Sequence, residues 1–185
     1  MVSTLTTVKW SIDDYHRMIE AGILGDRRAE LLWGEIVEMA PERKPHAHLS
    51  SSAGDYIREK LAGRAKVREE KPITLPDDSE PEPDIAVVQD LGDEYLEHHP
   101  YADNVFWLVE YADASLKKDL EIKSQLYAEA GIVEYWVVNL KTMELVVFTD
   151  PGAGGYQRQQ TLTEGWVSPV AFGDVNFAVS QFIRR

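Results

Sequence analysis

Hydrophobic positions recur along the chain with two periods, and the helical period predicts three helices. A first helix follows Ser11, where the sequence SIDD is typical of a capping box, and it stops at Gly22. Apolar residues three and four apart predict a second, amphipathic helix over residues 46–61. A third helix is predicted from about residue 115 to residue 130, because Gly131 is a suitable C-terminal cap.

Short runs of strand-forming residues lie between these helices. The segment LLWGEIVEMAP predicts two short strands around a tight turn at Trp33-Gly34, and ELVVFTDPGAGGYQRQQTL predicts an antiparallel hairpin across a glycine-rich turn. The polar and aromatic segment QDLGDEYLEHHPYADN predicts an irregular loop. Four further segments predict strands, of which the last three are apolar enough to be buried on both faces: VREEKPITLPDD, PDIAVV, VFWLVEY and EYWVVNL.

The order of these elements predicts the fold class. The strand at 105–111, the helix at 115–130 and the strand at 134–140 form a strand–helix–strand unit, which is typical of two parallel strands joined by a right-handed crossover. With the hairpin added, the prediction is an α/β fold with a mixed β-sheet flanked by helices. A single domain over residues 1–185 is expected, since no proline- or serine-rich linker divides the chain.

Composition excludes several classes of site. The chain has no cysteine, which excludes disulfides, thiolate zinc sites and a cysteine nucleophile, so any metal must bind oxygen or histidine. No apolar run approaches the length of a membrane span, and the N-terminus lacks the apolar core of a signal peptide. We therefore expect a cytoplasmic protein without a membrane partner. The formal net charge of -13 predicts weak, salt-sensitive or metal-dependent contact with any polyanion.

Two predicted strands carry an acidic residue at one end. Asp84 precedes the apolar run IAVV in the stretch EPEPDIAVV, and Glu110 lies near the end of VFWLVEY. A carboxylate beside a buried strand costs several kcal/mol of desolvation unless it is paired, hydrogen-bonded or bound to a metal. Turn chemistry is the alternative for Asp84, because proline and acidic residues commonly precede strands. The two acids lie side by side only if their strands are antiparallel or if one acid is offset inward.

A candidate cation lies on the third predicted helix. Asp119 and Lys123 are four residues apart and therefore share one face of that helix. An exposed ion pair of little energetic value is the alternative interpretation. Two carboxylates with an adjacent lysine are the minimum oxygen-ligand set for Mg²⁺ together with a positive group that positions water or steadies phosphate charge.

A family resemblance is carried by three segments, EPEPDIAVV, HPYADNVFWLVEYADASLKKDLEIK and LYAEAGIVEYWVVNL. It extends to ELLWGEIVEMAP and to the helix start PHAHL, and it covers roughly residues 28–150. In their order and spacing, these segments resemble the Uma-type family of putative restriction endonucleases, a branch of the PD-(D/E)XK nuclease superfamily. The resemblance implies a restriction-endonuclease-like core in which acidic residues bind Mg²⁺ or Mn²⁺ and a lysine assists hydrolysis of a phosphodiester.

The same resemblance assigns the central residues of the site. Asp84 matches the motif aspartate and Glu110 matches the acid of the second motif strand, which implies that these two residues bind the metal. The usual lysine two positions beyond the second acid is replaced by Ala112. In this family the lysine lies on the following helix, where Lys123 matches it.

Three further residues match supporting positions of the family. Asp119 matches an acid one turn before the lysine, which implies an ion pair that orients Lys123. His46 matches a histidine at the start of the second helix, with a capping or surface role as the alternative. Glu30 matches an N-terminal glutamate that would supply a further ligand, with a surface strand position as the alternative. Glu70 stands where the family commonly has glutamine.

Together these expectations describe a metal-dependent endonuclease that hydrolyses the phosphodiester bonds of nucleic acid, with DNA as its substrate. The acidic composition favours one alternative, a nuclease-like fold that acts as a binding or assembly module. A hydrolase of small phosphoesters is the second alternative. We also expect a homodimer, because VEYWVVN and the aromatic-rich hairpin after it offer apolar area beyond what one small sheet covers.

Overall fold

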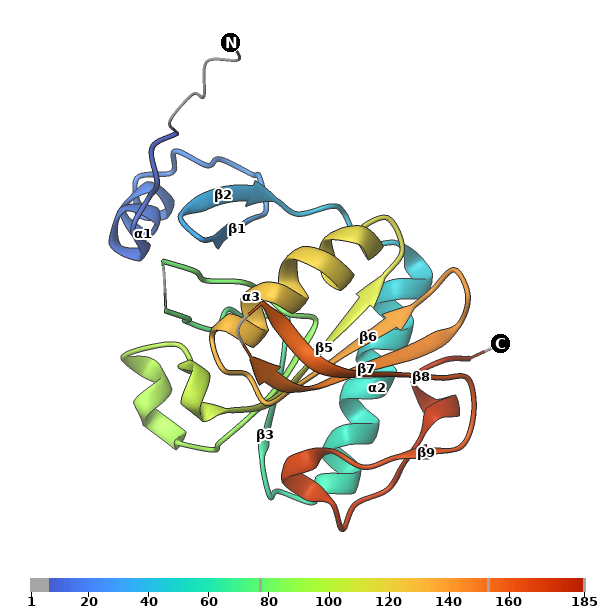
Figure 1. The fold of residues 1–185 in the computed structure, drawn as a ribbon. Helices are drawn as coiled ribbons and strands as arrows, with labels where there is room; N and C mark the ends of the chain where they lie inside the picture. Colours follow the sequence, from blue (N-terminus) through green and yellow to red (C-terminus); the bar gives the residue numbers. More distant parts are fainter. Residues whose placement is uncertain (1–6, 77, 153, 185) are drawn as a thin grey trace.

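A six-stranded β-sheet in the order β3-β4-β5-β6-β7-β8 lies at the centre of the fold (Figure 1). The structure is a computed structural model that describes residues 7–76, 78–152 and 154–184. Strands β5 and β6 are parallel, and the other neighbouring pairs of this sheet are antiparallel. The strands are β3 (Lys66–Glu69), β4 (Ile85–Val88), β5 (Val105–Ala112), β6 (Glu134–Asn139), β7 (Glu144–Gly152) and β8 (Gly155–Leu162).

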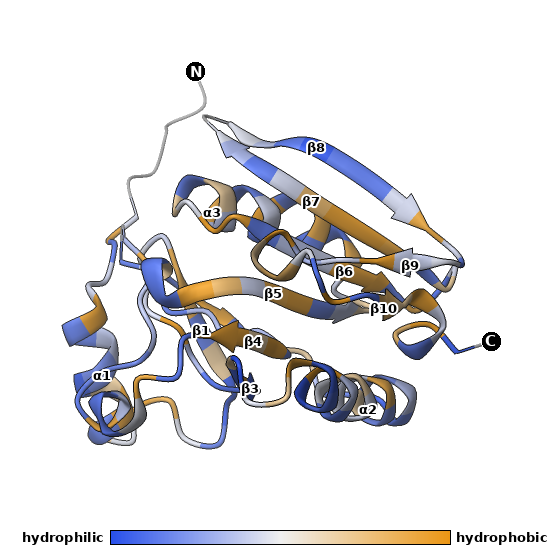
Figure 2. Ribbon diagram, turned by 90° about the horizontal axis from the view of Figure 1, so that it is seen from below, coloured by the Kyte–Doolittle hydropathy of each residue, from blue (hydrophilic) through white to orange (hydrophobic). Residues whose placement is uncertain are grey.

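Helices pack on both faces of this sheet, and each face has its own apolar core. Helix α2 (Lys44–Leu61) and the C-terminal segment pack on one face, where Trp107 and Trp136 are fully buried. Helix α3 (Ser124–Glu129) packs on the other face with Leu126 and Tyr127. Figure 2 shows β4 and β5 hydrophobic along most of their length and the edge strand β8 largely hydrophilic. The predicted α/β class with a mixed sheet is therefore confirmed.

Two small antiparallel sheets accompany the central one. Strands β1 (Ala29–Leu32) and β2 (Glu35–Glu38) form a hairpin whose two turn residues, Trp33 and Gly34, both have positive φ. Positive φ at both central residues is the signature of a type I′ turn, so the predicted tight turn is confirmed. The other small sheet pairs β9 (Trp166–Val167) with β10 (Phe177–Ala178).

The first two predicted helices form close to their predicted bounds. Helix α1 (Ile12–Glu20) is capped by the Ser11 side chain, which accepts the Asp14 N–H at 3.1 Å. Helix α2 begins two residues earlier than predicted, because proline is tolerated in the first turn of a helix. Among the described helices, none is long and apolar enough to cross a membrane.

Two other predicted elements differ from those observed. The segment VREEKPITLPDD forms a strand only up to Glu69, since Glu70 adopts a left-handed backbone conformation and Pro72 lacks a donor. The third predicted helix is α-helical only in part, because Lys118–Lys123 is a π-helix (η3) that continues into α3. The crossover prediction is nevertheless confirmed, since this helical segment connects the parallel strands β5 and β6.

The apolar strand that suggested a homodimer is covered within one chain. All six residues of β6 are buried, so this strand offers no free apolar face. A homodimer stays a prediction without that support.

Candidate active site

The antiparallel register of β4 and β5 brings Asp84 and Glu110 together. Ile85 pairs with Val109, so the next residues outward on the two strands, Asp84 and Glu110, lie opposite each other on one side of the sheet. The Tyr111 N–H donates to Asp84 Oδ2 at 2.6 Å and fixes that carboxylate. Of the two arrangements that the sequence left open, the antiparallel one is therefore observed.

Lys123 is buried between two carboxylates. Its Nζ lies 2.7 Å from Glu110 Oε1 and 3.0 Å from Glu30 Oε2, and only 2 % of its side chain is exposed. Tyr127, one helical turn later, donates its hydroxyl to the same Glu110 oxygen at 3.2 Å. Although burial disfavours its charge, the two carboxylates raise the pKa of Lys123 well above its usual value. Lys123 is thus a fixed internal cation.

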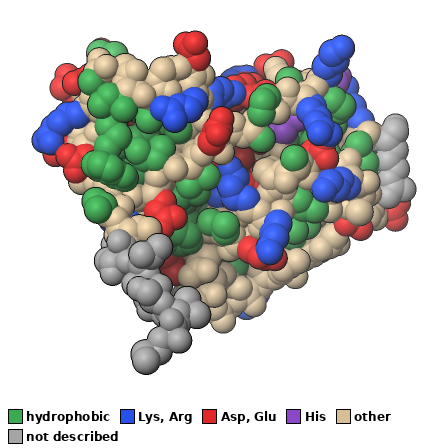
Figure 3. Space-filling model, turned by 90° about the horizontal axis from the view of Figure 1, so that it is seen from above, with side chains coloured by type: hydrophobic (Ala, Val, Ile, Leu, Met, Phe, Trp, Pro, Cys, Tyr) green, Lys and Arg blue, Asp and Glu red, His purple; other side chains and the backbone are tan. Residues whose placement is uncertain are grey.

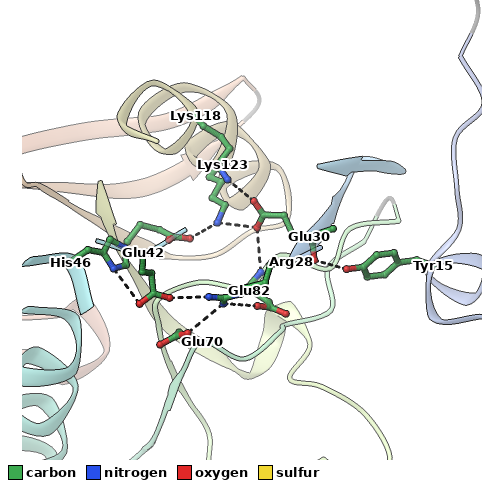
Figure 4. A network of polar contacts seen from close by, with 11 residues as sticks. Tyr15, Arg28, Glu30, Glu42, His46, Glu70, Glu82, Lys118 and Lys123 are labelled. Atoms are coloured by element: carbon green, nitrogen blue, oxygen red, sulfur yellow. Dashed lines mark hydrogen bonds and ion pairs between the residues drawn. The ribbon is translucent and has the colours of Figure 1, made fainter. Parts of the chain in front are cut away.

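Glu30 binds two lysines from the segment that follows β5 (Figure 4). Its Oε1 accepts from Lys118 at 2.7 Å, while its Oε2 contacts Lys123 and accepts the Glu82 N–H at 3.4 Å. Burial alone would raise the pKa of Glu30, but Lys123 and Lys118 outweigh it and lower the pKa. The side chain is 0 % exposed, so the surface alternative is wrong. Because lysines contact both of its oxygens, Glu30 holds the two lysines in place and has no carboxylate oxygen left for a metal ion.

Asp119 is buried beside this group without an ion pair to Lys123. Within the described chain, the ion pairs of Lys123 are those with Glu30 and Glu110, so the orienting pair implied for Asp119 does not form directly. Ser115 instead hydrogen-bonds the Asp119 side chain. Burial raises the pKa of Asp119. The exposed-pair alternative is wrong as well, since Asp119 and Lys123 are both buried.

His46 at the start of α2 contacts Asp84 directly. Its Nε2 lies 3.1 Å from Asp84 Oδ2, and its Nδ1 lies 3.7 Å from Glu42 Oε2. Burial lowers the pKa of the imidazole, but the Asp84 carboxylate outweighs this and raises it overall. His46 is largely buried and belongs to the site rather than to the surface.

The negative charge at the centre of the site is not fully balanced. Burial raises the pKa of Glu110 to about 8, with Asp84, Asp119 and Glu30 adding to the effect and Lys123 opposing it. An additional cation beside Glu110 would stabilise its ionised form, because an opposite charge favours ionisation.

Asp84, Glu110 and Lys123 line a cavity of about 80 Å³. Further acidic and basic side chains that line the same cavity pair with one another. Arg28 pairs with Glu42 at 3.0 Å and with Glu70 and Glu82 at 3.3 Å each. Figure 4 shows these carboxylates converging on the guanidinium. On the molecular face in Figure 3, basic side chains are interspersed with acidic ones and gather into no broad basic field.

The donor set can be compared with the requirements of a metal ion. Among the residues that the structure describes, no group of three or more His, Asp or Glu side chains is arranged to hold a metal. Mg²⁺, however, commonly uses only one or two carboxylates and takes its remaining ligands from water and substrate phosphate. The described hydrogen bonds engage Asp84 through Oδ2 and Glu110 through Oε1, which leaves Asp84 Oδ1 and Glu110 Oε2 without a described partner. Two neighbouring carboxylates, each with a free oxygen, fit such an ion.

An acid pair with a buried lysine, at the ends of two neighbouring strands of a mixed sheet, is the arrangement of a restriction-endonuclease-like protein. The chain belongs to the Uma2 family, described as "Putative restriction endonuclease", whose model matches residues 12–180. The resemblance inferred from the sequence is thereby confirmed. A crystal structure of "a putative nuclease belonging to DUF820" from Anabaena variabilis ATCC 29413 has the same fold, with a TM-score of 0.71 and 14 % sequence identity. That match covers 95 % of this chain and 97 % of the other. The comparison with curated proteins gave no match.

Several site residues were not identified from the sequence. Lys118 is five residues before Lys123, a spacing that places two residues on different sides of an α-helix. Arg28 has no sequence signal, because its partners come from three distant segments. Tyr127 does carry a signal, since it lies four residues after Lys123 and therefore on the same helical face.

Proposed function

We propose that this protein is a Mg²⁺- or Mn²⁺-dependent endonuclease that hydrolyses phosphodiester bonds, with DNA as its substrate. The observation that supports this most strongly is the position of Asp84 opposite Glu110, with Lys123 bound to Glu110, in one cavity. Membership of the Uma2 family supports the reaction class.

Asp84 and Glu110 would hold the metal ion. When bound, the ion would polarise a phosphate oxygen and lower the pKa of a water molecule. Asp84 is oriented for this role by the Tyr111 N–H and by His46, and Glu110 is oriented by Lys123 and Tyr127. Such partners fix the direction of a ligand's free oxygen, which preserves the coordination geometry.

Lys123 would contribute a preorganised positive charge. An ammonium group has three N–H donors, and Glu110 and Glu30 accept two of them. The third would position the attacking water or stabilise negative charge in the transition state. Glu110 and Glu30, with a smaller contribution from the buried Asp119, raise the pKa of Lys123 and so favour its charged form.

A hydrolase of small phosphoesters is a second candidate. The small volume of the cavity and the acidic rim formed by Glu42, Glu70 and Glu82 favour it, because both features hinder the approach of a long polyanion.

Cleavage of supercoiled and single-stranded DNA at low salt tests the proposal. Wild type, Asp84→Ala and Lys123→Ala would be compared with Mg²⁺, with Mn²⁺ and with chelator, and bis(p-nitrophenyl) phosphate would report small-ester hydrolysis. We expect metal-dependent cutting by wild type alone. Equal cutting by all three proteins would contradict the assigned site, while hydrolysis of the small ester without DNA cleavage would favour the second candidate. Light scattering at micromolar concentration tests the predicted homodimer in the same samples.

A further inference from the structure

The π-helix η3 aligns two lysines that an α-helix would separate. Across it, the Ser124 N–H donates to the Asp119 carbonyl, a hydrogen bond between residues five apart. At 3.6 residues per turn, residues five apart in an α-helix would point about 140° away from each other. Here Lys118 and Lys123 are five apart and reach the two oxygens of one carboxylate, that of Glu30. Figure 4 shows both side chains pointing to Glu30. π-helical turns of this kind are frequent at functional sites.

The two lysines differ in their access to the cavity. Both lysines line the cavity, but Lys123 is enclosed by Glu110 and Glu30. The Lys118 side chain is 23 % exposed. Lys118 makes its described ion pair through one contact, with Glu30. Since an ammonium group has three donors, two of those of Lys118 remain for a ligand in the cavity. Lys118 is therefore the lysine that an incoming anion meets first.

The two arginines that line the cavity are more heavily paired or more exposed than Lys118. Arg28 faces three carboxylates, those of Glu42, Glu70 and Glu82, so its charge is more than balanced. Arg43 pairs with Asp113, and its side chain is mostly exposed to solvent. Glu30, in contrast, is shared between two lysines. Lys123 has Glu110 as a second carboxylate partner, whereas the one described partner of Lys118 is this shared Glu30.

We infer that Lys118 binds a phosphate group of the substrate beside the Asp84–Glu110 pair, while Lys123 remains an internal cation. This inference rests on the proposed function and assigns a substrate-positioning residue that the proposal lacks. A backbone phosphate is the expected ligand, because a lysine binds phosphate as a point charge without base specificity. The π-helix is the element that makes this second cation available on the correct side.

A purely structural role for Lys118, as a link between β1 and η3, predicts different behaviour. Lys118→Gln can still donate a hydrogen bond to Glu30 but carries no charge. The variant therefore keeps the structural link between β1 and η3 and removes only the charge that would bind phosphate. Lys117→Gln is the matched control, since Lys117 is the adjacent lysine, is 85 % exposed, pairs with Glu121 and is not among the cavity-lining residues. Lys118→Arg keeps the charge and serves as the rescue variant.

The measurement is the affinity for a fluorescently labelled DNA duplex over a series of NaCl concentrations, with Ca²⁺ in place of Mg²⁺ so that binding is read without cleavage. Losing one phosphate contact should reduce the slope of log affinity against log salt by about 0.9 and weaken binding at 0.1 M salt about eightfold. We expect this for Lys118→Gln, with Lys117→Gln like wild type and Lys118→Arg close to wild type. Lys118→Met would replace Lys118→Gln if the latter did not fold.

Cleavage by wild type, measured in parallel with Mg²⁺, separates the two proposals. If wild type cuts DNA and Lys118→Gln shows the same salt slope as Lys117→Gln, the inference is wrong and the nuclease proposal stands. If wild type does not cut but the slope depends on the Lys118 charge, the phosphate site stands and the nuclease proposal is wrong. Failure of wild type to bind the duplex at any salt concentration would overturn the inference.

Discussion

Glu110 and Glu134 are two buried carboxylates at opposite ends of the parallel strand pair, and they differ in their partners. Glu110 lies near the end of β5 and is bound by the Lys123 ammonium and the Tyr127 hydroxyl, both on one oxygen. Glu134 begins β6, and its two oxygens accept the Trp136 Nε1–H and the Val170 N–H, each at 2.6 Å.

Burial raises the pKa of both acids, to about 8 for Glu110 and about 6 for Glu134. A perturbed pKa by itself therefore does not distinguish a reactive site from a structural one. The partners of the two acids differ, because Glu134 has both oxygens satisfied by fixed neutral donors, which favours a structural role. Glu110 has a cation on one oxygen and a second oxygen available in a cavity with Asp84.

The largest expected effect tests the charged partner of Glu110. Lys123→Ala leaves Glu110 and Glu30 buried without this cation, and breaking such a pair typically costs about 3–5 kcal/mol of stability. Glu134→Ala leaves the Trp136 Nε1–H unsatisfied in the core, for which about 1–3 kcal/mol is expected, whereas the Val170 N–H belongs to an exposed residue. Urea unfolding of both variants measures the difference. Equal losses of stability in the two variants would show that a charged partner and neutral partners stabilise these buried carboxylates to the same extent.

The next effect concerns activity and sharpens the functional side of the comparison. Glu110→Gln keeps an acceptor for Lys123 but removes the charge that would bind a metal, so DNA cleavage should fall about 100-fold to 1000-fold, the range seen when one electrostatic stabiliser is lost. Glu134→Gln should leave cleavage unchanged, because Glu134 lies at the other end of the strand pair. Plasmid nicking rates report both, and a comparable loss in Glu134→Gln would show that the two acids are not functionally distinct.

A smaller effect should appear in the pH dependence of stability. The folded pKa of Glu134 is raised from 4.5 to about 6, so the folded state binds more protons than the unfolded state in this interval. Its contribution to stability is complete below about pH 4.5 and falls by about 2 kcal/mol as the pH rises through 6. Subtracting the curve of Glu134→Gln from that of wild type, by chemical denaturation at each pH, isolates this change. A flat difference between pH 4 and pH 7 would contradict the assignment.

The smallest effect is expected at the surface, where neither kind of buried partner exists. Arg43 and Asp113 form a pair at 3.0 Å near the cavity, but the Arg43 side chain is mostly exposed. Arg43→Ala should therefore change stability by no more than about 1 kcal/mol. Thermal melting at two salt concentrations checks this value. If Arg43→Ala lost as much stability as Glu134→Ala, the exposure of a side chain would not determine how much its polar contacts contribute to stability.

The sequence was sufficient to predict the sheet and the two central acids. The runs PDIAVV and VFWLVEY are apolar enough to be buried on both faces, which marks β4 and β5 and places Asp84 and Glu110 at their ends. The direction of β4 relative to β5 was not predictable, because periodicity does not encode strand pairing. That direction is what sets the two acids side by side.

The partners of Lys123 were not predictable for a different reason. Helical spacing suggested a pair with Asp119, but η3 is a π-helix and the lysine turns to Glu30 and Glu110 instead. No local rule signals that Lys118 will share Glu30. The carboxylate comes from a hairpin 88 residues earlier in the chain, and only tertiary packing brings them together.

The long separation between Glu30 and its lysines has a consequence for the order of assembly during synthesis. The β1–β2 hairpin leaves the ribosome well before residues 118–123, so Glu30 has neither of its counter-charges while the first half of the chain is being made. Contacts between residues this far apart also close slowly, because the chain entropy of the loop is lost before the ion pairs form. The charged centre should consequently be among the last parts of the protein to become ordered, and the cavity that it lines would remain incomplete until η3 has been translated and docked.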